Sequence, residues 1–175
     1  MSELSDAGAD DALIAHRLER VALSSRISAA IYGLIVSGAV MAAAGEHGSA
    51  RDVAITVFIT VLAYWAAESY ADVLGEQIAE DRQPSWARAH ELLRQGWPLV
   101  QASYVPLVVL IVAWLLGASN TAAITAGLVV NALLLVALGW IAARQTERSL
   151  TGRVAEAALA GAFGVLMIAI KTVLH

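Results

Sequence analysis

The sequence contains no cysteine and only three prolines, and aromatic residues make up just 6% of its 175 residues. Without cysteine the chain can form neither a disulfide framework nor a thiolate metal site, so any metal ligand would be an oxygen or an imidazole nitrogen. Charged residues are also scarce, at 15%, and the formal net charge is −4. This balance argues against nucleic acid as a partner, because nucleic-acid-binding surfaces are rich in lysine and arginine.

Apolar residues are what the sequence has in excess. They make up 59% of the chain, and the mean hydropathy of +0.69 is well above that of a water-soluble domain of this size. A bilayer core about 30 Å thick requires about 20 predominantly apolar residues in an α-helix. Five such runs predict membrane-spanning helices over residues 27–44, 53–71, 99–116, 121–142 and 154–174. The predicted fold is an all-α, polytopic integral membrane protein with one membrane domain over residues 24–175.

Basic residues indicate the orientation of these spans, because arginine and lysine near span ends are retained on the cytoplasmic side. Of the 11 basic residues, only Arg51 and Lys171 lie at the opposite ends of the spans. The other nine are Arg17, Arg20, Arg26, Arg82, Arg88, Arg94, Arg144, Arg148 and Arg153. The distribution predicts a multi-pass protein of the cell membrane with its N-terminus in the cytoplasm and His175 outside.

Residues 1–23 are acidic and interrupted by charges, so we expect a retained cytoplasmic segment rather than a cleaved signal peptide. Asp10 or Asp11 can cap a helix in this segment. Its apolar positions Ile14, Leu18 and Val21 share one face, which predicts an amphipathic helix lying on the inner leaflet.

A second short helix is expected before the third span. Pro84 and Gly96 mark its two ends, because proline favours a helix start and glycine a helix end. Trp97 would then anchor the entry of the third span at the membrane surface.

Four carboxylates recur at intervals of four residues at the end of the second predicted span, at Glu68, Asp72, Glu76 and Glu80. On an α-helix this spacing places them along one slowly drifting face. If hydrocarbon begins at Val53, Glu68 lies roughly 22 Å along the helix, about 7 Å short of the opposite boundary. A charged carboxylate deep in the membrane costs about 3 kcal/mol, so Glu68 and Asp72 require compensation.

That compensation can be a bound proton, a hydroxyl partner or a bound cation. Carboxylates one turn apart offer successive oxygen ligands to divalent ions such as Fe²⁺ or Mn²⁺. The cation interpretation assigns metal ligands to Glu68, Asp72, Glu76 and Glu80, and it assigns the lining of the path to Tyr32, Tyr104 and Asn131. In the alternative interpretation, the last acids are the solvated end of a helix and Asn131 bonds a neighbouring helix.

Small residues at Ala29, Gly33 and Ser37 form a close-packing face on the first span. Such a face fits either a homodimer interface or contacts within one subunit. Both interpretations remain open from the sequence.

Three segments carry a resemblance to the vacuolar iron transporter family. They are ADVLGEQIAED with Gly75 and Glu76, ASYVPLVVLIVAWLLG with a central proline, and RVAEAALAGAFGVLMIAI. The chain resembles a distant, shortened member, which implies five spans, a cytoplasmic N-terminus, carboxylates on an extended second span and a homodimer. It differs from the family in having no acid in the first span. The chain is also similar to small membrane proteins of high-GC bacteria.

The sequence therefore predicts a divalent cation transporter. The alternatives are a non-transporting scaffold or subunit of a larger membrane complex, whose acidic stripe docks a basic partner, and a cation channel. We expect no enzyme, because zinc-protease, serine-nucleophile and phosphate-loop motifs are absent from the sequence. No cofactor is implied beyond Fe²⁺ or Mn²⁺ as the transported ion.

Overall fold

The computed structural model describes residues 2–45, 48–80, 85–144 and 162, and this part of the chain folds into four α-helices. They are α1 (Ser2–Ala44), α2 (Ala50–Glu80), α3 (Trp86–Leu115) and α4 (Asn120–Arg144). Each is long and apolar enough to cross a membrane. The predicted all-α class is confirmed, and four predicted spans correspond to these helices. The fifth, at 154–174, lies outside the described residues.

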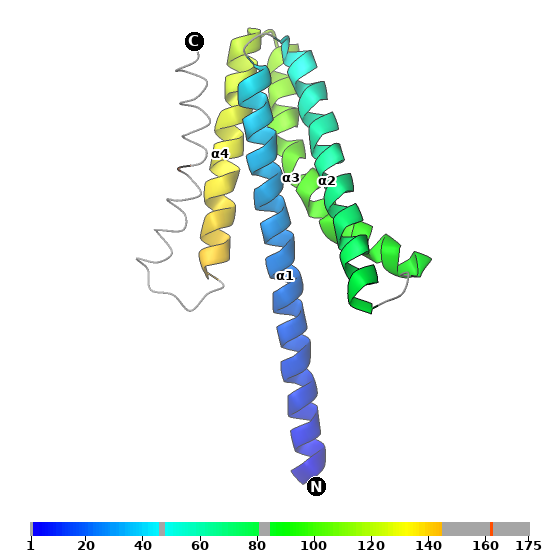
Figure 1. Ribbon diagram of the computed structural model, residues 1–175. Coiled ribbons are helices and arrows are strands. Elements are labelled where there is room, and N and C mark those ends of the chain that lie inside the picture. Colours follow the sequence, from blue (N-terminus) through cyan, green and yellow to red (C-terminus); the bar gives the residue numbers. More distant parts are fainter. Residues whose placement is uncertain (1, 46–47, 81–84, 145–161, 163–175) are drawn as a thin grey trace.

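The four helices form a bundle in which successive helices run in opposite directions (Figure 1). α3 packs against each of the other three, whereas α2 and α4 make few contacts with each other. α1 extends well beyond the other helices at its N-terminal end (Figure 1). α2 lies at one edge of the bundle, and this helix carries the four carboxylates spaced four residues apart.

Close packing between helices holds the bundle together. Met41, Val57, Leu99, Leu110 and Ile124 are fully buried, and they join all four helices in one core. In a bilayer the lipid is as apolar as these side chains, so van der Waals fit and interhelical hydrogen bonds stabilise the association.

Glycine permits the closest helix approach, between α1 and α3. A Cβ on Gly33 would overlap the backbone carbonyl of Leu99. The Ser103 hydroxyl also donates to the Gly33 carbonyl at 3.4 Å. The small-residue face of the first span is thus used inside the subunit, since Ser37 is buried as well. Of the two interpretations of this face, contacts within one subunit are confirmed for Gly33 and Ser37. A homodimer stays a prediction.

The predicted helix start at Asp10 or Asp11 is also wrong, because α1 begins at Ser2 and runs through both positions without a break. No glycine or proline occurs between Gly8 and Gly33 to interrupt it. The hydroxyls of Ser24 and Ser25 donate to carbonyls one turn earlier, at 2.8 and 2.9 Å, so these serines are accommodated within the helix. Contact of this segment with the membrane surface stays a prediction.

The predicted short helix before the third span is not separate. α3 continues from Trp86 through Gly96 and Pro98 to Leu115. Pro98 has no N–H to donate to the carbonyl of Arg94, which loosens the helix there. In Figure 1 the first turns of α3 lean out toward the end of α2. The result is one bent helix that covers α2 with its first turns and the bundle centre with the rest.

Candidate functional site

A tryptophan pair orients the acidic part of α2 against α3. The Trp65 indole N–H donates to the Leu93 carbonyl at 3.1 Å, and the rings of Trp65 and Trp97 meet edge to face with centroids 5.2 Å apart. Gly96 leaves room for this ring, because a Cβ there would lie 3.2 Å from Trp65 Cδ1. These contacts fix the rotation of α2, and therefore the direction in which Glu68, three residues later, projects.

All four carboxylate-bearing positions lie on α2, which confirms that they share one helix. The Glu68 side chain is partly buried, and Asp72 is exposed. Glu76 is 16% exposed, whereas the side chain of Glu80 lies outside the described part. The stripe is thus not uniform, because Glu68 and Glu76 turn toward the protein and Asp72 turns away from it.

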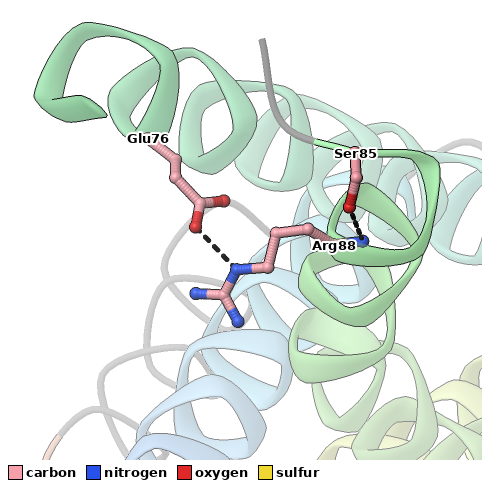
Figure 2. Close-up of polar contacts among 3 residues, drawn as sticks. All are labelled: Glu76, Ser85 and Arg88. Carbon is pink, nitrogen blue, oxygen red and sulfur yellow. Dashed lines mark hydrogen bonds and ion pairs between the residues drawn. The ribbon is translucent and has the colours of Figure 1, made fainter. Parts of the chain in front are cut away.

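Glu76 has a basic partner on α3. The Arg88 Nε–H donates to Glu76 Oε1 at 2.6 Å, and Ser85 caps α3 by accepting from the Arg88 backbone N–H at 3.3 Å (Figure 2). The ion pair joins the two helices where α2 ends and α3 begins. Sequence reasoning missed this pair. The sequence feature that could have predicted it is an acidic and a basic residue placed on either side of a short connection between two helices.

Three buried side-chain oxygens in the described part of the chain have no hydrogen-bond partner. They are Glu68 Oε2, Ser69 Oγ and Glu76 Oε2, and all three lie within three turns of α2. Ser69 as a whole is only 2% exposed. Buried polar atoms in native proteins nearly always have a partner, so their concentration on one segment indicates where a ligand, a proton or water is needed.

These oxygens do not form a single multidentate metal site. Glu68 and Glu76 are eight residues apart, which is about 12 Å along a helix. Among the described residues no group of three or more histidines and carboxylates is positioned to hold a metal ion. The arrangement offers two separate positions, one at Glu68 with the Ser69 hydroxyl beside it in sequence and one at Glu76, where Arg88 already occupies one oxygen.

Of the three residues predicted to line a path, only Tyr32 lies near these positions. Tyr32 on α1 meets Tyr64 on α2 edge to face, with ring centroids 5.9 Å apart. Because Tyr64 precedes Glu68 by one helical turn, Tyr32 is near the acidic face. Tyr104 instead lines an apolar cavity of about 290 Å³ beside Phe58, between α2 and α3.

Asn131 is 1% exposed and joins α4 to α1. Its side-chain amide donates to the Leu34 carbonyl at 3.0 Å, and its Oδ1 accepts from the Ser37 hydroxyl at 3.0 Å. This is the interhelical bonding expected of a polar residue inside a span. Its contacts are those of a packing residue, and they place it away from the acidic face of α2.

The candidate site thus consists of Glu68 and Ser69, one turn of α2 after the Tyr32–Tyr64 pair, and of the Glu76–Arg88 ion pair at the end of the helix. Comparison of the chain with protein-family models, curated proteins and solved structures finds no match.

Proposed function

We propose that this protein transports a cation across the membrane, with Fe²⁺ and Mn²⁺ as the first ions to test, and that the Glu68 carboxylate binds the ion within the span. One observation supports the proposal above all others, namely that every buried side-chain oxygen without a partner in the described part lies between Glu68 and Glu76. The resemblance to vacuolar iron transporters guides the choice of ions.

The physical reason lies in the cost of an unpaired carboxylate. An ionisable group inside a span is expensive unless a partner neutralises it, and such groups mark ion or proton pathways. Glu68 supplies a buried oxygen, and a cation bound there would remove the cost. Hard divalent ions retain water in their coordination sphere, so one carboxylate with water and a hydroxyl suffices for transient binding.

Glu76 would be the next position on α2 at which the ion binds. An ion arriving there competes with the Arg88 guanidinium, which donates to one carboxylate oxygen at 2.6 Å. Arg88 is half exposed and can move aside into solvent. This exchange would make the last turns of α2 a gated exit rather than an open funnel.

The proposed topology has five spans and places the two termini on opposite sides of the membrane. Five spans, with the fifth over residues 154–174, would place the N-terminus in the cytoplasm and His175 outside, because nine of 11 basic residues then lie on the inner side. The ion pair of Glu76 and Arg88 would lie at the cytoplasmic end of the bundle. The membrane would be the cell membrane of a bacterium.

Uptake into proteoliposomes tests the proposal. Wild-type protein should accumulate Mn²⁺ or Fe²⁺ above empty liposomes, and Glu68→Gln should abolish uptake because it removes the charge while keeping the side-chain size. Glu19→Gln, on an exposed part of α1, is the control and should transport normally. Equal uptake by wild type and Glu68→Gln would contradict the role of Glu68.

The second candidate is a non-transporting subunit of a larger membrane complex. The observation in its favour is the Glu76–Arg88 pair, which demonstrates that this face binds a guanidinium group, together with the exposed carboxylate of Asp72. A partner helix could present such a group to Glu68 or Asp72. Absence of uptake above empty liposomes in every variant would favour this candidate.

A further inference from the structure

A groove of about 610 Å³ lies between α1 and the first turns of α3. Arg26 lines it from α1, and Glu91, Arg94 and Gln95 line it from α3. Its size falls within the range of about 300–1,000 Å³ that small-ligand sites occupy. The groove is separate from Glu68 and its neighbours, none of which lines it.

The packing of α1 on α3 sets the depth of this groove. Arg26 lies seven residues before Gly33, and Arg94 lies five residues before Leu99, which Gly33 touches. These offsets correspond to about 10 Å and about 8 Å along the two helices, so both arginines lie at nearly the same level.

That level is the boundary of the apolar part of the bundle. The apolar run of α1 starts at residue 27, directly after Arg26, and that of α3 starts at residue 99. Trp97, partly exposed, lies between Arg94 and this run, where tryptophan commonly marks the membrane–water interface. The groove therefore opens at the height of the lipid headgroups.

The charges in the groove select an anion. Two guanidinium groups and one carboxylate, those of Arg26, Arg94 and Glu91, leave a net charge of +1. Neither arginine forms an ion pair with another residue of the described part. Arginine binds phosphate through paired hydrogen bonds, and basic pockets between spans bind anionic lipid headgroups.

We propose that this groove binds the headgroup of an anionic glycerophospholipid. Arg26 and Arg94 hold the phosphodiester, and the acyl chains continue from Arg26 along the apolar faces of α1 and α3 into the bilayer. Glu91 and Gln95 face the part of the headgroup beyond the phosphate, where they bond hydroxyl groups. A lipid of charge −1 with a hydroxylated headgroup, such as phosphatidylglycerol, balances the net charge of the groove.

Native mass spectrometry of the full chain in detergent, titrated with phosphatidylglycerol, measures this binding. Each of Arg26→Gln and Arg94→Gln should weaken binding about fivefold, and the double variant about 25-fold, as expected for a cation near anionic lipid. Arg51→Gln, an exposed arginine outside this groove, is the matched control and should bind like wild type. Circular dichroism checks that every variant is folded.

Glu91→Gln separates the proposal from a folding defect and from other lipids. It should strengthen phosphatidylglycerol binding, because the net charge of the groove rises from +1 to +2 while the glutamine amide can still bond the headgroup hydroxyls. If the site instead held phosphatidylethanolamine, whose ammonium group Glu91 would bind, the same change would weaken binding and overturn the proposal. So would unchanged phosphatidylglycerol binding by the double arginine variant, equal binding of phosphatidylcholine, or displacement of the lipid by excess inorganic phosphate.

Discussion

Polar side chains inside the spans are of two kinds. Asn131, Ser37 and Trp65 have partners on a neighbouring helix, at 3.0–3.1 Å. Glu68 and Ser69, three and four residues after Trp65 on α2, have buried oxygens with no partner in the described part. The first kind explains how the helices stay together. The second kind is the basis of the proposed ion site, because packing alone gives no reason for a buried carboxylate oxygen there.

Replacing Asn131 by alanine tests the packing role. Asn131→Ala removes two hydrogen bonds to α1 and leaves the Ser37 hydroxyl with only its local bond to Leu34. The free energy of unfolding should fall by about 1–2 kcal/mol. Reversible unfolding in mixed detergent micelles measures this change.

The matched control is Thr60→Val, because Thr60 is only partly buried and its hydroxyl bonds only one turn back within α2. It should change stability by less than about 0.5 kcal/mol. Cation uptake should persist in folded Asn131→Ala if its role is packing. Loss of uptake in a variant of normal stability would contradict a role in packing alone and would support the prediction that Asn131 lines the ion path.

Sequence reasoning at this scale selected Glu68 as a candidate ion ligand, which stays a prediction, and did not predict which residues surround the acidic positions. Spacing along one helix is local, so the shared helix of the four acids was predictable from the residues. The Arg88 partner of Glu76 was not, because the contact depends on how the start of α3 bends over α2. The buried Ser69 hydroxyl carried no sequence signal, since serine is common in apolar helices.

At the scale of elements, the approach of α1 to α3 at Gly33 organises the bundle. Gly33→Ala would place a methyl group against the Leu99 carbonyl. Because that carbonyl belongs to the backbone of α3, it cannot rotate away as the end of a flexible side chain can, and the two helices would have to move apart. We expect a loss of about 1–3 kcal/mol, typical of overpacking. Unfolding in detergent measures it.

Gly75→Ala is the matched control in α2. A Cβ at this exposed position meets nothing within 4 Å, so the substitution should stabilise the helix by about 0.5–1 kcal/mol through its higher helix propensity. If both substitutions changed stability alike, the close approach of α1 and α3 would be wrong.

The helices themselves were largely predictable from hydropathy, but their ends were not. Apolar runs locate the hydrocarbon-spanning part of a helix and leave its continuation into polar sequence unspecified. Asp10 and Asp11 resembled caps although α1 runs through them, and Gly96 resembled a terminus although Trp65 packs against it. Glycine ends a helix only where no tertiary contact requires it inside one.

For the whole molecule, the arrangement places α2, the helix with the four regularly spaced carboxylates, at an edge of the bundle. α2 packs on α3, touches α1 less and hardly reaches α4. Composition and the length of the apolar runs predicted an all-α membrane protein, because about 20 apolar residues in a helix span a bilayer core. The order of helices around α3 could not be predicted, since it depends on the fit of particular residues such as Gly33 and Gly127.

The orientation of the whole molecule is testable with single cysteines, because the native chain has none. Ser2→Cys, at the start of α1, should react with a membrane-impermeant maleimide only after the cells are permeabilised. Ala118→Cys, in the turn between α3 and α4, should react in intact cells. The reverse pattern would invert the proposed topology, and equal labelling at both positions in intact cells would contradict three membrane crossings by α1, α2 and α3.

Manganese binding at Glu68 is the central claim, and electron paramagnetic resonance tests it most directly. Free Mn²⁺ gives a six-line spectrum whose intensity falls when the ion binds protein. Titration of wild-type protein in detergent should reduce the signal, and Glu68→Gln should restore the intensity of free Mn²⁺ while Glu19→Gln binds like wild type. Equal binding by wild type and Glu68→Gln, or no binding by either, would contradict the assignment of the cation site to Glu68.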